Sequence, residues 1–276
     1  MSGAMRYELK YRLPIRVIAE IRDQIVPHVR FDPHCACRAG HHYTVRSIYF
    51  DSDDLCFYHE KHDGVRVRRK LRVRTYGEFA ADSVAFIEIK RKFGRRGCKE
   101  RLCLPLDLVA TALNGGARRD DLVQRRRDRI VLAKVGHLVA LKKLRPVVLV
   151  TYEREAHIGR RDERLRVTFD RNIRSLIDPT LEQIHREREL QQFEDRNFVL
   201  ELKYDDRMPG WMARLIRQLN LVANPYSKYC HGIDAWSERN GKPHPVPEQT
   251  EKIAVAPRPA RCPDHRLPEK SRVSHG

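Results

Sequence analysis

The stretch Lys70-Leu71-Arg72-Val73-Arg74-Thr75-Tyr76 alternates charged or polar side chains with apolar ones. In a β-strand, residues i and i+2 point to the same face. Arg72 and Arg74 would therefore share one face, and the apolar residues around them would lie on the other. The segment Phe86-Ile87-Glu88-Ile89-Lys90 repeats this alternation. Both segments predict strands with one charged face and one apolar face.

The same pattern recurs along the chain. It places long charged side chains together at Glu8 and Lys10, Arg66 and Arg68, Arg164 to Asp170, and Glu201 and Lys203. Glu-x-Lys alone appears three times, at 8/10, 88/90 and 201/203. For any one strand, an antiparallel sheet with a solvent-exposed face explains the pattern. The excess of Lys and Arg over Thr, Ser and Gln on so many strands is unusual for such a face.

Crowding these cations on an open, flat sheet would be unfavourable. Two unit charges about 5 Å apart repel by roughly 3 kcal/mol at an effective dielectric constant near 20. A closed antiparallel barrel would turn the apolar faces outward against helices and leave the charged faces lining the lumen. Carboxylates in such a lumen could hold a divalent cation that bridges to phosphate oxygens. We therefore expect an α+β fold, mainly antiparallel β, with a closed β-barrel tunnel, flanking helices and metal-assisted phosphate chemistry.

Composition agrees with a polyanion as ligand. The chain has 276 residues, with 55 Lys and Arg against 37 Asp and Glu and a formal net charge of +18. No apolar run approaches the length of a membrane span, and no signal-peptide pattern follows Met1. Seven irregularly spaced cysteines argue against a disulfide scaffold. The expected compartment is the cytoplasm.

The chain divides into two regions. Residues 1–236 read as one folded domain, and residues 237–276 hold seven of the fifteen prolines and read as a disordered tail. The expected helices lie at 14–26, 106–113, 120–145 and 208–221. The expected strands lie at 43–50, 65–76, 85–92, 147–158, 164–170 and 198–204.

Together these motifs resemble the VTC domain family, the polyphosphate-polymerase branch of the triphosphate tunnel metalloenzymes. The matching segments span about 5–235 and follow one order: Arg6 to Tyr11, Ser47 to Asp51, Lys70 to Gly77, Phe86 to Lys90, Tyr152 to Arg154, Leu165 to Asp170, Leu200 to Lys203 and Ser227 to Tyr229. Related triphosphatases and cyclases open with Glu-x-Glu-x-Lys. Arg6 stands at the first Glu here, which favours the VTC branch.

The resemblance implies roles for individual positions. Those expected to bind or act on the phosphates are Lys10, Arg72, Arg74, Lys90, Arg154, Arg166, Lys203 and Lys228. Arg72 and Arg74 resemble the pair that grips the triphosphate, and Glu201 resembles the metal-holding glutamate. Glu8 and Glu88 are expected as further metal carboxylates.

The function that the resemblance implies is polyphosphate synthesis. The enzyme would be a metal-dependent phosphotransferase that moves the γ-phosphoryl group of ATP onto a polyphosphate chain with Mn²⁺ or Mg²⁺. A tunnel-type triphosphatase with water as acceptor, and a non-catalytic polyphosphate or nucleotide binder, remain alternatives. Nucleic acid is not an expected partner, because the cations alternate along strands and no platform of stacking aromatic residues is evident.

One other cluster has ligand-type residues. His34, Cys35, Cys37, His41 and His42 lie close in sequence, although Cys-x-Cys is tighter than the usual zinc spacing. A polar loop is the simpler interpretation, and a zinc site remains the alternative.

Overall fold

The computed structural model describes residues 6–80, 82–94, 96–114, 122–224 and 226–241. Its strands are β1 (Arg6–Pro14), β2 (Val29–Phe31), β3 (Tyr43–Asp51), β4 (Val67–Tyr76), β5 (Val84–Phe93), β6 (Arg96–Pro105), β7 (Arg145–Gly159), β8 (Arg166–Ile177), β9 (Gln191–Glu194) and β10 (Asn197–Tyr204). Its helices are α1 (Ile18–Ile25), α2 (Pro33–Ala36), α3 (Cys56–His62), α4 (Val109–Asn114), α5 (Arg126–Lys142), α6 (Gly210–Gln218) and α7 (Lys228–Asn240), with 3-10 turns at Ile15–Val17, Leu106–Leu108 and Leu181–His185.

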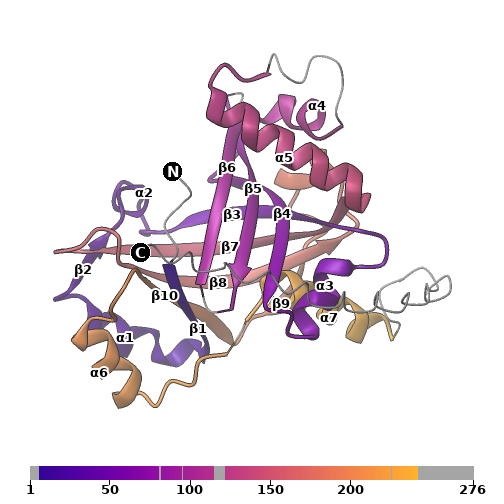
Figure 1. The fold of residues 1–276 in the computed structure, drawn as a ribbon. Coiled ribbons are helices and arrows are strands. Elements are labelled where there is room, and N and C mark those ends of the chain that lie inside the picture. The colour runs from indigo at the N-terminus through magenta and orange to yellow at the C-terminus, as the bar shows by residue number, and fades with distance from the viewer. Residues whose placement is uncertain (1–5, 81, 95, 115–121, 225, 242–276) are drawn as a thin grey trace, which may run out of the picture.

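The strands form one sheet in the order β2-β7-β3-β4-β5-β6-β1-β10-β8-β9. A further pairing of β7 with β8 closes the run from β7 to β8 into a ring of strands (Figure 1). The pairs in this ring are antiparallel. The contact between β1 and β6 is short, with Arg6 opposite Gly97 and Tyr7 opposite Arg96. The ring therefore has inner faces that point at one another across a common interior.

The outer faces of β3 to β6 are apolar and are covered by α4 and α5 (Figure 1). Leu71, Ile87 and Leu102 of the strands share one buried cluster with Val131 and Leu138 of α5. These are the apolar positions of the alternating segments. Their burial leaves the intervening charged residues on the inside of the ring.

A second cluster covers the outer faces of β8 and β10. Phe169 and Leu200 pack there with Ile21 of α1 and with Met212 and Leu215 of α6. Burying one such side chain is worth about 1.5 to 3 kcal/mol. Helices therefore cover the apolar outer faces on two sides of the ring.

Helix α7 closes one part of the interior. Its residues Tyr229, Cys230 and Ile233 are buried with Tyr49 and Val148 of the strands. The side chain of Ser227 accepts a hydrogen bond from the backbone of Cys230 and caps the start of this helix. The last segment of the described fold thus completes the chamber that the strands begin.

Asp51, at the end of β3, links α7 to α3. Its buried carboxylate accepts hydrogen bonds from the backbone N–H groups of Phe57 (2.9 Å) and Tyr58 (3.0 Å) at the start of α3. It also accepts the hydroxyl of Tyr229 from α7. One carboxylate therefore fixes two helices against the strand that lines the interior.

The mainly antiparallel sheet and the flanking helices confirm that part of the expected fold. The expected strands are present, with β8 extending to Ile177, and β2, β6 and β9 are additional strands that the sequence pattern did not predict. The expected helix at 120–145 is shorter at both ends: α5 begins at Arg126, and Lys143, with a left-handed φ of 48°, ends it at Lys142. Helix α7 runs to Asn240, past the expected domain boundary at 236, and residues 242–276 of the expected tail lie outside the described residues. Among the described helices, none is long and apolar enough to cross a membrane.

The buried role of Asp51 can be tested by substitution. Asp51→Ala should lower the free energy of unfolding by about 3 to 5 kcal/mol, because buried N–H groups lose their acceptor. Asp53→Ala is the control: Asp53 is exposed and pairs with Arg145, so its loss should change stability by less than about 1 kcal/mol. Denaturant unfolding measures both, and equal effects would show that Asp51 does not hold the helices.

Candidate active site

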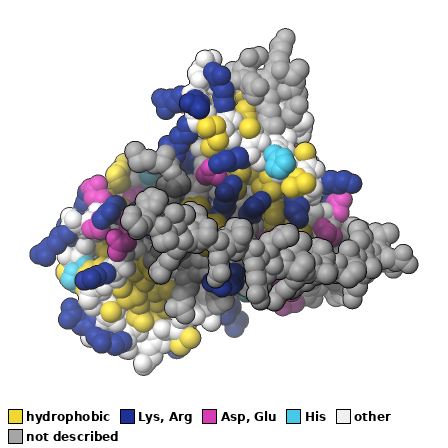
Figure 2. All heavy atoms as spheres, in the orientation of Figure 1, with side chains coloured by type: hydrophobic (Ala, Val, Ile, Leu, Met, Phe, Trp, Pro, Cys, Tyr) yellow, Lys and Arg dark blue, Asp and Glu magenta, His cyan; other side chains and the backbone are white. Residues whose placement is uncertain are grey.

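The inner faces of the ring enclose a cavity of about 470 Å³. Among the described residues that line it, eleven are Lys or Arg and two, Glu8 and Glu201, are acidic. Figure 2 shows Lys and Arg side chains gathered over the strands β4 to β6 on one face of the molecule. The predicted charged interior is therefore present as a cationic cavity.

Strand β4 supplies the longest row of cations. Arg68, Lys70, Arg72 and Arg74 alternate along its inner face and line the cavity. The guanidinium of Arg74 donates to the hydroxyls of Ser47 (2.9 Å) and Tyr152 (3.2 Å). These hydroxyl groups hold Arg74 in place, and among the described residues no carboxylate forms an ion pair with it.

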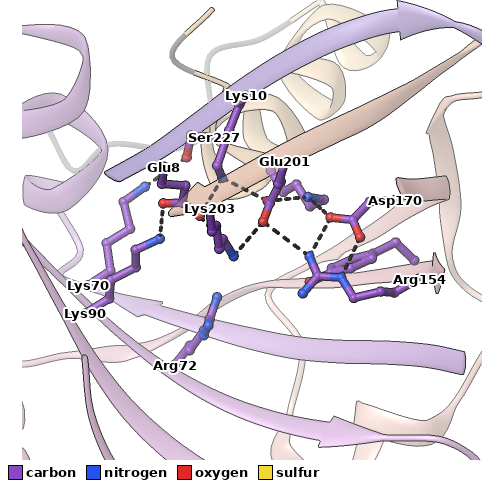
Figure 3. A network of polar contacts seen from close by, with 12 residues as sticks. Glu8, Lys10, Lys70, Arg72, Lys90, Arg154, Asp170, Glu201, Lys203 and Ser227 are labelled. Atoms are coloured by element: carbon purple, nitrogen blue, oxygen red, sulfur yellow. Dashed lines mark hydrogen bonds and ion pairs between the residues drawn. The ribbon is translucent and has the colours of Figure 1, made fainter. Parts of the chain in front are cut away.

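Two glutamates separate the lysines of β1, β5 and β10 (Figure 3). Glu8 lies 2.9 Å from the ammonium of Lys90 and 3.2 Å from that of Lys203. Burial by itself would raise the pKa of Glu8, but Lys90, Lys10 and Lys203 outweigh it and hold the pKa well below its usual value. The carboxylate therefore stays ionised within the cation cluster.

The pKa of Lys90 is also lowered, which for an ammonium group disfavours the charged form. Burial lowers its pKa to about 8, because the attraction of Glu8 offsets only part of the lost hydration and of the repulsion from Lys10 and Lys203. An anion bound beside Lys90 would favour the protonated ammonium.

Glu201 is the second carboxylate of the cavity. It lies 3.1 Å from Lys10 and 2.8 Å from Lys203 (Figure 3). It also lies 3.3 Å from Lys228. Burial would raise the pKa of Glu201, but the ammonium groups dominate and place the pKa well below its usual value. Glu201 is therefore a fixed negative charge among cations from β1, β10 and α7.

Asp170, which the sequence analysis placed on the charged face without a role, organises the wall next to Glu201. Both of its oxygens accept from Arg154, at 2.6 Å each (Figure 3). One of them also lies 2.5 Å from the ammonium of Lys228. Burial by itself would raise the pKa of Asp170, but the positive charges of Arg154 and Lys228 outweigh burial and lower the pKa, so the carboxylate stays ionised. The strand alternation could have indicated this role, because Asp170 lies two residues after Thr168 on the same face of β8, and Thr168 pairs with Glu201 of β10.

Most of the predicted site residues come together, and two do not. The cavity lining contains Glu8, Lys10, Arg72, Arg74, Lys90, Arg154, Glu201, Lys203 and Lys228. Glu88 lies behind the lining, where it is fully buried and bonds Arg72 (2.6 Å), Lys99 (3.0 Å) and Arg101 (3.2 Å). Arg166 reaches away to Asp32, at 2.7 Å. Glu88 therefore supports Arg72, and Arg166 lies outside the cavity.

Several lining residues were not among the predicted set. Lys61, Arg68 and Lys92 extend the cationic lining, while Lys70 donates to the hydroxyl of Ser227 at 2.9 Å. Tyr49 also lines the cavity. The alternation placed Arg68 on a charged face without a role and could also have identified Lys70, because both share the inner face of Arg72. Lys61 belongs to helix α3, so no strand pattern marks it.

The two cavity carboxylates suit a divalent cation that also binds phosphate. Within the described ranges, no three His, Cys, Asp or Glu side chains gather into a protein-only metal site. Mg²⁺ and similar ions are commonly held by one or two carboxylates together with phosphate oxygens. Glu201 and Glu8 share the neighbours Lys10 and Lys203 and fit that requirement, whereas Glu88 is enclosed by its own cations.

The Cys and His cluster does not converge on one point. The Sγ atom of buried Cys35 accepts the backbone N–H of Ala156 at 3.2 Å, whereas Cys37 is exposed and bonds the carbonyl of His34. The ring of His41 stacks on Phe31. These contacts belong to the short helix α2 and its loop, and they do not form a metal site.

Three comparisons relate this chain to known proteins. The family model described as VTC domain matches residues 5–237. The chain is 24% identical, over 272 residues, to vacuolar transporter chaperone complex subunit 4 of Schizosaccharomyces pombe; the match covers 83% of this chain and 37% of the relative. The chain thus spans well under half of that relative's length.

Two solved structures show more distant similarity. A putative adenylyl cyclase from Hippeastrum, described as having a dominant triphosphatase activity, is 14% identical with a TM-score of 0.44, covering 88% of this chain and 99% of that chain. A protein of Pyrococcus horikoshii is 12% identical with a TM-score of 0.35, covering 78% of this chain and 86% of that chain.

The role of Asp170 leads to a stability prediction. Asp170→Asn should lower the free energy of unfolding by about 3 kcal/mol, because Arg154 and Lys228 lose a buried counter-charge. Inorganic tripolyphosphate should raise the melting temperature more in this variant than in the parent, since added anions replace the missing charge. Asp178→Asn, at a half-exposed ion pair with Arg145, is the control and should match the parent in both measurements. A parent-like Asp170→Asn melting curve would contradict the assignment.

Proposed function

The chain belongs to the VTC domain family, and on that premise we propose that it is a polyphosphate polymerase. The reaction would transfer the γ-phosphoryl group of ATP to the end of a polyphosphate chain held in the cavity. The observation that carries this proposal is the charge of that cavity: eleven cations and two glutamates among the described lining residues, enclosed by a ring of strands that we interpret as a tunnel.

The geometry fits phosphoryl transfer, which asks the protein mainly for positioning and charge stabilisation. Arg72 and Arg74 lie side by side on β4, with Arg154 of β7 and Lys228 of α7 also lining the cavity. Such cations would hold the triphosphate from several directions and stabilise the charge that shifts toward the leaving diphosphate. Lys10, Lys90 and Lys203 would hold the acceptor phosphate for in-line attack.

Glu8 and Glu201 are negatively charged and would repel a polyanion, so their presence in the cavity requires an explanation. Glu201, with Glu8 beside it, would hold Mn²⁺ or Mg²⁺, and the bound ion would supply Lewis-acid stabilisation of phosphate oxygens. In the absence of substrate the same carboxylates pair with Lys10 and Lys203, which limits repulsion among the lysines. The identity of the metal, the use of ATP and a cytoplasmic location belong to this proposal.

Product analysis tests the reaction directly. Purified protein incubated with ATP and Mn²⁺ should form phosphate chains that resolve as a ladder on a gel. Orthophosphate as the sole phosphate product would identify a triphosphatase, because water would then be the acceptor. Unchanged ATP with measurable tripolyphosphate binding would identify a non-catalytic binder. Either result would overturn the polymerase assignment.

Two arginines on opposite faces of β4 provide a matched binding test. Arg72→Ala should weaken tripolyphosphate binding by about 1.5 to 3 kcal/mol, roughly 10- to 150-fold, through loss of charge-assisted hydrogen bonds. Arg69→Ala removes the same charge from an exposed position on the outer face of that strand and should leave the affinity nearly unchanged. Calorimetry measures both affinities, and equal losses would mean that only net charge matters.

Glu201→Gln should separate metal binding from polyanion binding. The variant keeps the side-chain shape, so tripolyphosphate affinity without metal should stay equal or rise as a negative charge leaves the cavity. Turnover should fall at least about 100-fold at low Mn²⁺ and recover partly at high Mn²⁺, because a carboxylate ligand is lost. Glu163→Gln, at an exposed position, is the control. Overlapping curves of rate against Mn²⁺ for parent and Glu201→Gln would remove Glu201 from the metal site.

A further inference from the structure

Tyr49 is a cavity residue to which the proposed reaction assigns no role. It lies on the inner face of β3, where its direct cross-strand neighbour on β4 is Arg72. Its side chain is mostly buried, and its ring lies 5.4 Å from that of Tyr229 on α7. The packing holds the hydroxyl at the cavity wall beside the proposed triphosphate site.

The hydroxyl of Tyr49 faces cations. The Nη1 group of Arg72 donates to it at 3.3 Å, and the Arg72 guanidinium carbon lies 5.8 Å from the ring centre. Other charges that act on it come from Arg74 and Lys70 of β4, Lys228 of α7 and Lys10 of β1. The cavity carboxylates Glu8 and Glu201 are engaged by lysines. In the described part of the chain, no carboxylate accepts a hydrogen bond from this hydroxyl.

Two other tyrosines of the same cavity show the contrast. The hydroxyl of Tyr226 donates to Glu194 at 3.4 Å, and that of Tyr229 donates to Asp51. Burial and these carboxylates raise the pKa of both phenols. Tyr226 and Tyr229 therefore keep their protons, and each hydroxyl acts as a donor.

The pKa of Tyr49, in contrast, is lowered. Burial would raise the pKa of the phenol, but Arg72 and Arg74, with a smaller contribution from Lys228, lower it to about 7. A phenolate at this position would add a negative charge beside Arg72, which also pairs with Glu88, and beside Arg74, which donates to the hydroxyls of Ser47 and Tyr152. A polyanion bound to the same cations would compete with that phenolate.

We propose that Tyr49 is an exchangeable anion of the cavity: its phenolate balances Arg72 and Arg74 while the cavity is empty, and it takes up a proton from solvent when polyphosphate binds. The inference rests on the proposed function, because it requires a polyphosphate at the Arg72 site. The neutral hydroxyl then becomes a hydrogen-bond donor that a phosphate oxygen can accept. Binding of substrate and of a proton at Tyr49 are therefore linked.

The first test uses the ultraviolet absorbance of tyrosinate during a pH titration of the full chain. The difference between the parent and Tyr49→Phe should show one tyrosine ionising near pH 7. Tyr76, whose pKa is lowered to about 8 by Arg74 against the effect of burial, is present in both proteins and cancels. Saturating tripolyphosphate without metal should move the Tyr49 transition to higher pH. Absence of a near-neutral transition in the free protein would overturn the inference, whatever the protein binds.

The second test measures the proton itself. Calorimetric titration with tripolyphosphate in buffers of different ionisation enthalpy gives the number of protons exchanged on binding. About one pH unit above the pKa of about 7, Tyr49 is mostly ionised, so the parent should take up close to one proton more than Tyr49→Phe when tripolyphosphate binds. About one pH unit below that pKa, Tyr49 is already protonated and the difference between the two proteins should vanish. Ionisation of tripolyphosphate cancels between the two proteins. Tyr226→Phe, which removes a cavity phenol that stays protonated, should match the parent.

The outcomes separate the inference from the proposed function. Binding with no difference in proton uptake would overturn the role of Tyr49 and leave the polyphosphate cavity intact. No binding of tripolyphosphate to the parent would overturn the proposed function and, with it, the linkage. A parent-like proton uptake in Tyr49→Phe would assign the proton to another group and reject Tyr49.

Discussion

Mutual repulsion among buried cations is the constraint on which the rest of this structure depends. Arg and Lys side chains from β1, β4, β5, β7, β10 and α7 point into one chamber, and at about 5 Å two such charges repel by roughly 3 kcal/mol. Each cluster contains a carboxylate: Glu88 lies behind Arg72, Glu8 between Lys90 and Lys203, Glu201 beside Lys10, and Asp170 beneath Arg154. The anions hold the cations in place without neutralising the chamber.

The chamber exists because the opposite faces of the same strands are apolar and are buried against helices. Leu71 and Val73 are fully buried against the helices, while Arg72 and Arg74 between them are turned inward. A strand cannot rotate one set of side chains without moving the other. Charge repulsion inside is therefore balanced by apolar packing outside, and the helices α1, α5 and α6 contribute to the site although their side chains lie outside the chamber.

Strand alternation predicted much of this arrangement. It identified which side chains face inward on β1, β4, β5 and β10, because that depends on local periodicity alone. It could not distinguish Glu88 from Glu201, since both occur in Glu-x-Lys pairs and differ only in which cations surround them after folding. Arg166 shares the face of Asp170, yet its long side chain reaches Asp32 from another part of the chain. Strand β6 was missed because Cys98 to Arg101 carries little apolar alternation, and its pairing with β5 determines its structure.

The pairing of the first strand with β10 has a consequence for how the protein is made. Arg6 on β1 bonds Asp205, which lies 199 positions later in the chain, so β1 leaves the ribosome long before its main partner exists. Long-range pairing of this kind slows folding and leaves a strand edge open to other chains in the meantime. Charged Arg6, Glu8, Lys10 and Arg12 along that edge discourage such contacts. Of these residues, Glu8 and Lys10 also line the finished cavity, so part of the charge of the site also disfavours pairing of the free strand edge with other chains.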